Sequence, residues 1–383
     1  MPLYLNEDQD MLKDSARGFV AEKAPVAHMR KLRDASDATG FDPALWREFG
    51  EMGFASILIP EDEGGLGLGH VEAGIVMEEV GKNLSPSPML STAVAAVTAL
   101  KAGGAQHREK WFPKIAAGDA VAALAIDEGA KHDPAATAMR AERSGNGFKL
   151  TGTKQFVVYG HVADLIIVAA RTGGAAGETD GITLFAVEKD AANLTADPRR
   201  LADASLAARL TFDDVDVDAD AVIGEVDEGW GPLSALLNAG RAGASAELLG
   251  IGQGVADQTM DYIKERKQFG VPIGSFQALQ HRSAHLYAEL EVARAAVLKA
   301  QQLLDAISEE GGSEKAAKAV HVAKAMTGMT TTLAVQEGVQ MHAGVGMTDE
   351  YDVGLYMKRG RVLAELFGDA NYHADRMARD AGY

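Results

Sequence analysis

The hydrophobic pattern of this chain changes period twice, and that change limits the folds open to it. From about Glu7 to Asp119, apolar residues recur at helical spacing. From about Ala122 to Val226, the segments become short and rich in β-branched residues, with Gly, Asp or Asn at their ends. Long helical segments return from Trp230 onward. This order favours an α+β protein whose strands form an antiparallel barrel or sandwich rather than repeated βαβ units.

The same changes divide the 383-residue chain into three expected domains. We expect an N-terminal helical domain over 1–121, a middle β-domain over 122–228 and a C-terminal helical bundle over 229–383. The bundle prediction rests on one apolar stripe that alternates steps of four and three. The stripe consists of Leu286, Leu290, Ala293, Val297, Ala300 and Leu304.

Composition excludes several classes of function. A net charge of -18 argues against nucleic acid and anionic membrane surfaces as partners. The absence of cysteine excludes disulfides and thiolate metal sites. No apolar run reaches the length of a membrane span, and the N-terminus carries early acids instead of a signal-peptide pattern. We therefore expect a cytoplasmic protein.

The segment from Glu265 to His281, ERKQFGVPIGSFQALQH, is too specialised to serve only as a link between two helices. Arg266 offers a fixed-charge fork suited to a diphosphate. Phe269 offers a flat apolar face, and the glutamines offer both donors and acceptors. These are the requirements of a dinucleotide-like cofactor.

Two other motifs are better explained by a structural role than by ligand binding. GIGQG at Gly250–Gly254 lies inside a helical pattern with no strand before it, so close helix packing is preferred to a Rossmann fingerprint. His281, His285 and Glu289 share one helix face, but we expect no metal there.

The run QMHAGVGMT at Gln340–Thr348 is a glycine-punctuated break between helices. Its backbone can approach a phosphate closely, and together with Arg266 this favours a cofactor loop over a plain connection.

Taken together, these motifs resemble the acyl-CoA dehydrogenase superfamily along nearly the whole chain. ERKQFGVPIGSFQALQH resembles its flavin-site signature, and IPEDEGGLG followed by MEEVGK resembles its N-terminal helical domain. TGTKQFVVYGHVADLIIVAAR resembles its β-domain flavin strands, and GVQMHAGVGM its later glycine loop.

The resemblance implies a helical domain, a β-domain and a four-helix bundle assembled as a dimer of dimers. It places FAD between the β-domain and the bundle, with the adenine-diphosphate half reaching the neighbouring subunit. In the partner subunit, Gln340 and Gly344 would contact that half, while Arg241 corresponds to a substrate-binding arginine. The remaining residues implied to contact FAD are Phe156, Val158, Arg266, Gln268, Phe269, Ile273, Phe276, Gln277 and Asp369.

The chain departs from the family at the catalytic base. In AELFGDANYH, Phe367 stands where many members carry the glutamate that removes the α-proton, and a phenyl ring cannot accept a proton. A second subgroup carries its base just before the arginine that matches Arg241, and that position is Gly240 here.

Three carboxylates remain candidates for the base. Glu247 follows Gly240 by about two helical turns on nearly the same face, in an apolar setting expected to raise its pKa toward a base's working range. The alternative is that Glu247 is exposed or paired with an arginine of the bundle. Asp369 matches a flavin-contacting position, so a cofactor hydrogen bond competes with catalysis. Glu365 is the third candidate, and its place before Gly368 favours a different face.

The β-domain also departs from the family. DEGAKHDP keeps Glu128 but loses a Gly-Ser pair, and Phe156-Val157-Val158 replaces a Trp-Ile-Thr triplet. Val158 cannot give flavin N5 the side-chain hydrogen bond that threonine would give, which leaves the backbone amides to hold the ring.

Three functions therefore remain open. The first is an FAD-dependent acyl-CoA dehydrogenase that forms a trans-2-enoyl-CoA, passes electrons to an electron-transfer flavoprotein and serves fatty-acid or lipid catabolism. The second is a non-catalytic partner subunit, so that the tetramer would be heteromeric instead of homomeric. The third is a flavin monooxygenase on the same fold.

Overall fold

The protein is α+β, and the computed structural model describes residues 3–307 and 312–383. Its contacts divide into two compact units that alternate along the chain. The helical unit consists of Met1–Asp34, His70–Pro86 and Arg241–Tyr383, and the sheet unit consists of Ala35–Gly69 and Ser87–Gly240. Helix α7 (Trp230–Glu265) begins in the sheet unit and continues into the helical unit.

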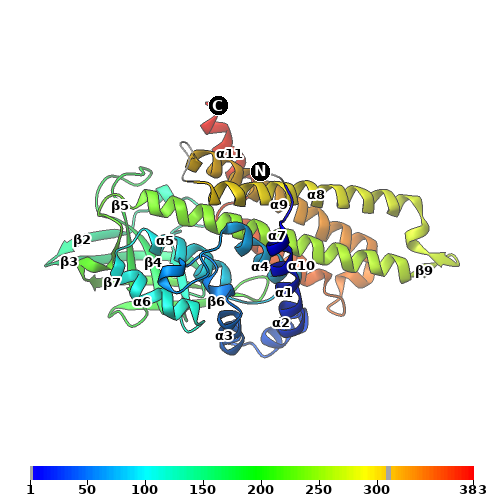
Figure 1. Ribbon diagram of the computed structural model, residues 1–383, viewed down its shortest axis with the longest axis horizontal. Helices are drawn as coiled ribbons and strands as arrows, with labels where there is room; N and C mark the ends of the chain where they lie inside the picture. The colour runs from blue at the N-terminus through cyan, green and yellow to red at the C-terminus, as the bar shows by residue number, and fades with distance from the viewer. Residues whose placement is uncertain (1–2, 308–311) are drawn as a thin grey trace. The chain divides into compact units, whose positions relative to one another are not determined.

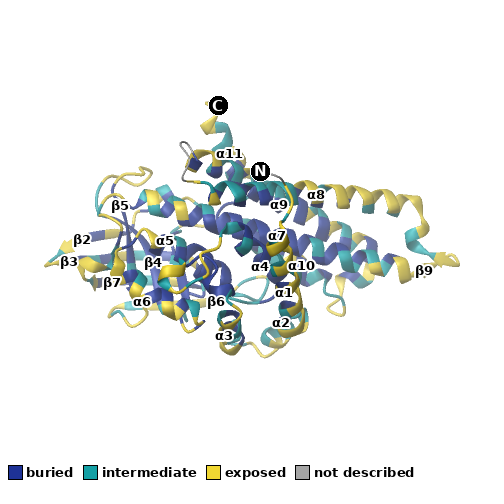
Figure 2. Ribbon diagram, in the orientation of Figure 1, coloured by how far each residue is buried: buried dark blue, intermediate teal, exposed yellow. Residues whose placement is uncertain are grey.

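Long helices packed along their lengths form the helical unit (Figure 1). The predicted apolar stripe lies on α8 (Gln277–Asp305) and is buried, which confirms the sequence prediction. Other residues of the same helix are exposed, among them Tyr287 and Val292, and Figure 2 shows both exposed and buried stretches along α8. The other helices of this unit are α1 (Glu7–Lys23), α2 (Val26–Asp34), α4 (His70–Lys82), α9 (Gly312–His342), α10 (Val353–Glu365) and α11 (Ala370–Asp380).

Glycines let α4 and α7 approach each other closely. A Cβ added to Gly81 would collide with the carbonyl oxygen of Glu247, and one added to Gly250 would collide with that of Glu78. At Gly254 an added Cβ would stand 2.7 Å from the Lys82 carbonyl oxygen. The GIGQG motif is therefore a helix-packing motif, as the sequence predicts.

One eight-stranded sheet forms the centre of the sheet unit, with strand order β6-β7-β3-β2-β4-β5-β8 and β1 paired to β4. Most pairs are antiparallel, as expected from the sequence. However, β1 pairs parallel with β4, and β2 meets β4 in parallel at Arg140 and Arg171. The strands are β1 (Ala122–Ala125), β2 (Arg140–Ser144), β3 (Gly147–Val158), β4 (Leu165–Arg171), β5 (Ile182–Glu188), β6 (Leu194–Arg200), β7 (Leu206–Val217) and β8 (Val222–Ile223).

Helices also belong to the sheet unit. The first, α3 (Pro43–Glu51), begins with Asp42, whose side chain accepts from the Ala44 amide, and with proline at the first helical position. Trp46 on this helix is buried and donates to the Ala120 carbonyl at 3.2 Å. The remaining helices are the π-helix Met89–Ala96, α5 (Val97–Lys101) and α6 (Ala105–Ala116).

Candidate functional site

A hairpin follows α7 and presents the residues expected to meet a cofactor. Its strands are β9 (Lys267–Gln268) and β10 (Val271–Pro272), and the turn residues Phe269 and Gly270 have φ of 55° and 85°. Positive φ at both turn positions is the geometry of a type I′ turn. Phe269 is 92% exposed at the tip. The hairpin thus holds an aromatic ring out in solvent, where it is available to a ligand or a second chain.

Arg266 enters this hairpin as an exposed cation. Its backbone is fixed, because its amide bonds the Tyr262 carbonyl and its own carbonyl accepts from Ile273. Within the part of the chain that the structure describes, no ion pair or side-chain hydrogen bond holds the guanidinium. An arginine with a fixed backbone and a free fork is suited to an anionic group.

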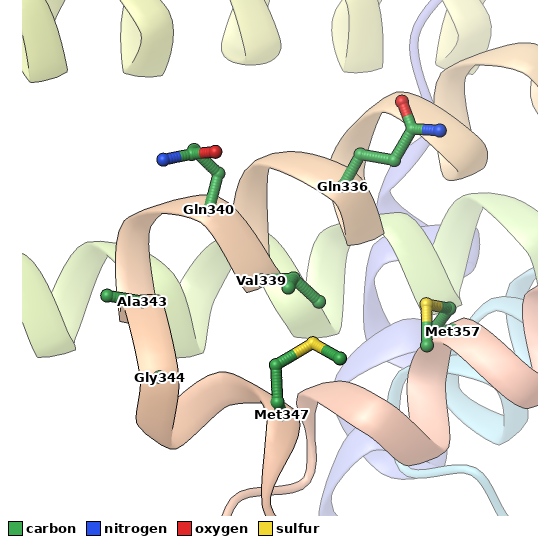
Figure 3. A pocket seen from close by; sticks show the side chains of 7 residues that line it. All are labelled: Gln336, Val339, Gln340, Ala343, Gly344, Met347 and Met357. Carbon is green, nitrogen blue, oxygen red and sulfur yellow. The ribbon is translucent and has the colours of Figure 1, made fainter.

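The end of α9 borders a cavity of about 380 Å³ (Figure 3). Gln340 and Gly344 both line it, and a Cβ added to Gly344 would meet nothing within 4 Å. Ala343 has φ of 55°, a backbone conformation that favours glycine. The complete lining is Gln336, Val339, Gln340, Ala343, Gly344, Met347 and Met357.

The hairpin and this cavity are linked through ring stacking. Tyr262 near the end of α7 stacks on His342 near the end of α9, with centroids 4.3 Å apart and planes 22° apart. Burial lowers the pKa of His342, so the stacked imidazole is neutral near neutral pH. The two elements expected to meet FAD therefore lie at the same end of the bundle.

These residues fit the adenosine-diphosphate half of FAD. The free fork of Arg266 suits the diphosphate, and the open space at Gly344 lets a phosphate or sugar approach the backbone. Gln268 is exposed within the hairpin. After the hairpin, Ile273 is half-buried, Phe276 is exposed, and Gln277 is exposed at the start of α8. Phe269 and Phe276 meet edge to face, with centroids 6.1 Å apart.

A turn between α10 and α11 carries Phe367, the residue that the sequence resemblance aligns with the family's base. Phe367 is buried with φ of 60°, and Gly368 follows with φ of 105°. Arg241 is buried on α7; its Nε donates to the Phe367 carbonyl at 3.1 Å, and a terminal nitrogen donates to the Tyr372 hydroxyl at 3.3 Å. The expected substrate-binding arginine is therefore bound to the turn that bears Phe367.

The structure gives each of the three candidate carboxylates a partner. Glu247 is buried and accepts from Nε of Arg359 at 2.8 Å and from a terminal nitrogen of Arg359 at 2.6 Å. Asp369 caps α11 by accepting from the Tyr372 amide at 2.8 Å. Glu365 pairs with Arg361 at 2.8 Å. The pairing of Glu247 with an arginine is the alternative that the sequence left open, whereas the sequence identified none of the three partners by position.

Lys324 on α9 is a site residue that the sequence did not indicate. It is buried, and its Nζ donates to the carbonyls of Ala364 at 2.9 Å and Gly368 at 3.1 Å. Burial, followed by the repulsion of Arg241, lowers its pKa to about 7. A lysine inside an apolar helical pattern offers one signal, because such a residue is rarely buried without a purpose.

In the sheet unit, the expected flavin-ring residues follow a register shift of β3. Phe156 is 54% exposed with φ of 54°, inside the irregularity between Lys154 and Val157. Val158 is half-buried and pairs with Ala207. The bulge therefore turns the Phe156 ring away from the regular pleat.

Glu128 has a structural role in the loop before β2. Its carboxylate accepts from the amides of Ala138 and Met139 and from Nζ of Lys154 at 2.7 Å. Lys154 is fully buried, and burial lowers its pKa against the opposing charge of Glu128. This buried pair fixes the loop in the absence of the Gly-Ser pair that the family has.

A second cavity, of about 610 Å³, lies in the sheet unit beside β2 and includes Arg140, Arg143 and Arg171 in its lining. Arg171 donates to backbone carbonyls, among them those of Thr137 and Asp180 at 2.8 and 2.9 Å. Arg140 pairs with Glu142 at 3.1 Å. The guanidinium groups of Arg140 and Arg171 are thus already engaged by the protein itself.

No cluster of three or more metal-ligating side chains occurs in residues 3–307 and 312–383. His285 instead pairs with Glu289 at 3.5 Å on the surface of α8. Across the same residues, no helix combines the length and the apolar character needed to span a bilayer.

Three family models match the chain. They are described as the N-terminal, middle and C-terminal domains of acyl-CoA dehydrogenase, and they match residues 6–119, 122–215 and 227–382. Among curated proteins, acyl-CoA dehydrogenase IpdE2 of Mycolicibacterium smegmatis is 31% identical over 367 residues, which is 95% of this chain and 96% of that protein.

Solved structures of similar fold cover the whole chain. One, described as an electron transferring flavoprotein of Acidaminococcus fermentans, is 29% identical with a TM-score of 0.89 and covers 100% of both chains. Another, from the ChsE4-ChsE5 complex of Mycobacterium tuberculosis, is 25% identical with a TM-score of 0.86 and covers 100% of this chain and 99% of that one.

Proposed function

Because the chain belongs to the acyl-CoA dehydrogenase family, we propose that it carries out FAD-dependent α,β-desaturation of an acyl-CoA thioester to a trans-2-enoyl-CoA. The observation that carries this proposal is the grouping of Arg266, Phe269 and the cavity at Gln340 and Gly344 at one end of the bundle. Electrons would leave to an electron-transfer flavoprotein, and the assembly would be a dimer of dimers.

Two features of this end of the bundle would bind FAD: the positive charge of Arg266 and the open space beside the backbone at Gly344. The Arg266 fork would neutralise the diphosphate, which the net charge of -18 would otherwise repel. Gly344 and Gln340 of a partner subunit would hold the adenosine half, and Phe156 and Val158 would hold the flavin ring through their backbone. Bound FAD supplies the acceptor for the hydride that leaves the β-carbon.

Removal of the α-proton requires a carboxylate, and we assign it to Glu247. This side chain lies on the same helix as Arg241, which binds the Phe367 turn, and Arg359 holds it in one orientation. To accept the proton, one carboxylate oxygen must face the thioester while Arg359 retains the other.

A specific observation favours a second function. Phe367 fills the base position, and Glu247, Asp369 and Glu365 each have a structural partner. A chain in which no carboxylate is left for proton transfer would serve as the partner subunit of a heteromeric dehydrogenase. In that role Arg266 and Gln340 would complete the flavin pocket of another chain.

One experiment separates the two functions. The chain is expressed alone, its flavin is counted per chain, and the rate at which acyl-CoA thioesters bleach that flavin is measured without oxygen. Glu247→Gln should slow bleaching by about 10²–10⁴-fold, the usual contribution of a general base. The matched control Glu314→Gln changes an exposed carboxylate paired with Lys318 and should have no effect.

A homotetramer with one flavin per chain and full activity would exclude the partner-subunit function. Equal bleaching by wild type and Glu247→Gln would remove Glu247 as the base. Oxygen uptake that depends on reduced flavin would instead indicate the monooxygenase chemistry.

A further inference from the structure

Three side chains donate hydrogen bonds to the short turn at Phe367 and Gly368. Two successive residues have positive φ, which is unfavourable for phenylalanine. Arg241 donates to the Phe367 carbonyl, while Lys324 Nζ and His373 Nε2 both donate to the Gly368 carbonyl at 3.1 Å. Side chains from α7, α9 and α11 thus converge on two consecutive carbonyls. A strained backbone that is fixed in this way commonly marks a functional position.

The hydrogen bonds of Lys324 match a neutral amine. A neutral amine has two N–H groups, and the two carbonyls at Ala364 and Gly368 accept both. An ammonium has three N–H groups. In the described chain its third hydrogen would find no acceptor, because these carbonyls are the only partners of Nζ. The exposed fraction of Lys324 is 1%, so water does not replace the missing acceptor.

The charges around Lys324 come from three elements. Arg241 on α7 repels an ammonium, whereas Glu365 at the end of α10 and Asp369 before α11 attract it. Burial, assisted by Arg241, outweighs the two carboxylates and places the pKa of Lys324 at about 7. The amine therefore changes charge within the physiological pH range.

Two histidines lie beside the same turn. His321 and His373 approach through their Nδ1 atoms at 2.7 Å, so only one of these two nitrogens carries the shared proton. Nε2 of His373 donates to the Gly368 carbonyl. The two rings therefore join α9 and α11 at the turn that Lys324 also contacts.

We propose that Lys324 is a positioning residue: its neutral amine holds the turn at Phe367 and Gly368 in the form that accepts the acyl thioester, and protonation loosens that turn. The physical reason is that a buried ammonium adds an unmatched N–H and a positive charge beside Arg241, which holds the preceding carbonyl. This inference rests on the proposed function only in its link to the thioester, since the turn occupies the family's base position.

Hydrogen exchange on the ligand-free protein tests the behaviour of the turn. The readout is the protection of the Gly368 and Tyr372 amides, corrected for the intrinsic pH dependence of exchange. The neutral fraction of a group with pKa of about 7 falls about tenfold between pH 8 and pH 6. Wild type should therefore lose about tenfold in protection over that range.

Lys324→Gln separates a positioning role from a merely structural one. A primary amide donates two N–H groups but carries no charge, so this variant should keep its protection within about twofold from pH 8 to pH 6. Lys318→Gln is the matched control, because Lys318 lies on the same helix and its side chain is 43% exposed. The amide protection of Lys318→Gln should fall from pH 8 to pH 6 as that of wild type does. An equal change in amide protection between pH 8 and pH 6 in wild type and Lys324→Gln would overturn the proposal.

Thioester binding tests the functional link. Octanoyl-CoA and cyclohexanecarbonyl-CoA serve as the straight-chain and ring probes in anaerobic titrations at pH 6 and pH 8. The Kd of wild type should rise about tenfold toward pH 6, and that of Lys324→Gln should stay constant. A pH step in exchange with a constant wild-type Kd would overturn the link. If neither probe binds at any pH, the proposed function fails, while the exchange result still decides the behaviour of the turn.

Discussion

Replacing Lys324 with methionine should change how the stability of the protein depends on pH. The folded protein holds this amine at a pKa of about 7, whereas the ordinary value is 10.5. Between these two values, the unfolded chain binds a proton that the folded protein does not bind. Wild-type stability should therefore rise with pH through this window, and the full penalty for burying the charge should apply below pH 7.

The size of the effect follows from the difference between the pKa of Lys324 in the folded protein and its ordinary value. One pKa unit corresponds to about 1.4 kcal/mol. For each pH unit above pH 7, the free energy of unfolding of wild type should therefore rise by up to about 1.4 kcal/mol relative to that of Lys324→Met. Across the whole window the upper limit is about 5 kcal/mol. For a chain of this length, each pH unit corresponds to roughly 2 °C in Tm.

The assay is thermal unfolding of wild type, Lys324→Met and the surface control Lys318→Met at half-unit steps of pH. Methionine keeps the length of the side chain but removes the donor, so a constant loss from two unbonded carbonyls should accompany the pH-dependent difference. Parallel curves for wild type and Lys324→Met from pH 7 to pH 10 would refute the assignment of a buried neutral amine.

Further substitutions test the packing and the cofactor end. Ala343→Gly should raise the free energy of unfolding by roughly 0.5–1 kcal/mol, because it relieves a positive φ, and should tighten FAD binding; denaturant unfolding and flavin titration measure the two effects, and a weaker FAD affinity would contradict the cavity assignment. Gly81→Ala should lower the free energy of unfolding by about 3 kcal/mol, because its methyl group meets the Glu247 carbonyl; an unchanged unfolding midpoint would mean that α4 and α7 are not in close contact. Arg359→Met should cost about 3 kcal/mol by leaving the buried Glu247 without its cation, and the additional substitution Glu247→Gln should restore most of that loss in the same unfolding assay.

Local patterns in the sequence were sufficient to predict the helices and strands. These patterns depend on residues within one segment and not on the segments that pack against it. The stripe from Leu286 to Leu304 identifies the buried face of α8, since its spacing follows the helical period. GIGQG likewise predicts a close helix contact, because only glycine leaves room for a neighbouring backbone. The order of helices and strands follows from the same kind of evidence.

The contacts of the candidate site could not be predicted, because they join residues that are distant in sequence. The sequence allows Glu247 to be paired with an arginine of the bundle, but nothing near Glu247 indicates that this arginine is Arg359. Lys324, Gly368 and His373 meet only after α9, α10 and α11 have packed together. The parallel pairing of β1 with β4 depends on the path of the chain between them, which strand patterns do not encode.

The most direct test of the account is a single anaerobic turnover with analysis of the thioester by mass spectrometry. The purified protein, loaded with FAD, is mixed with the acyl-CoA that binds it most tightly. We predict a product two hydrogen atoms lighter, in an amount equal to the flavin that is bleached. An unchanged thioester beside fully oxidised, stoichiometric flavin would contradict the proposal that this chain is itself a dehydrogenase.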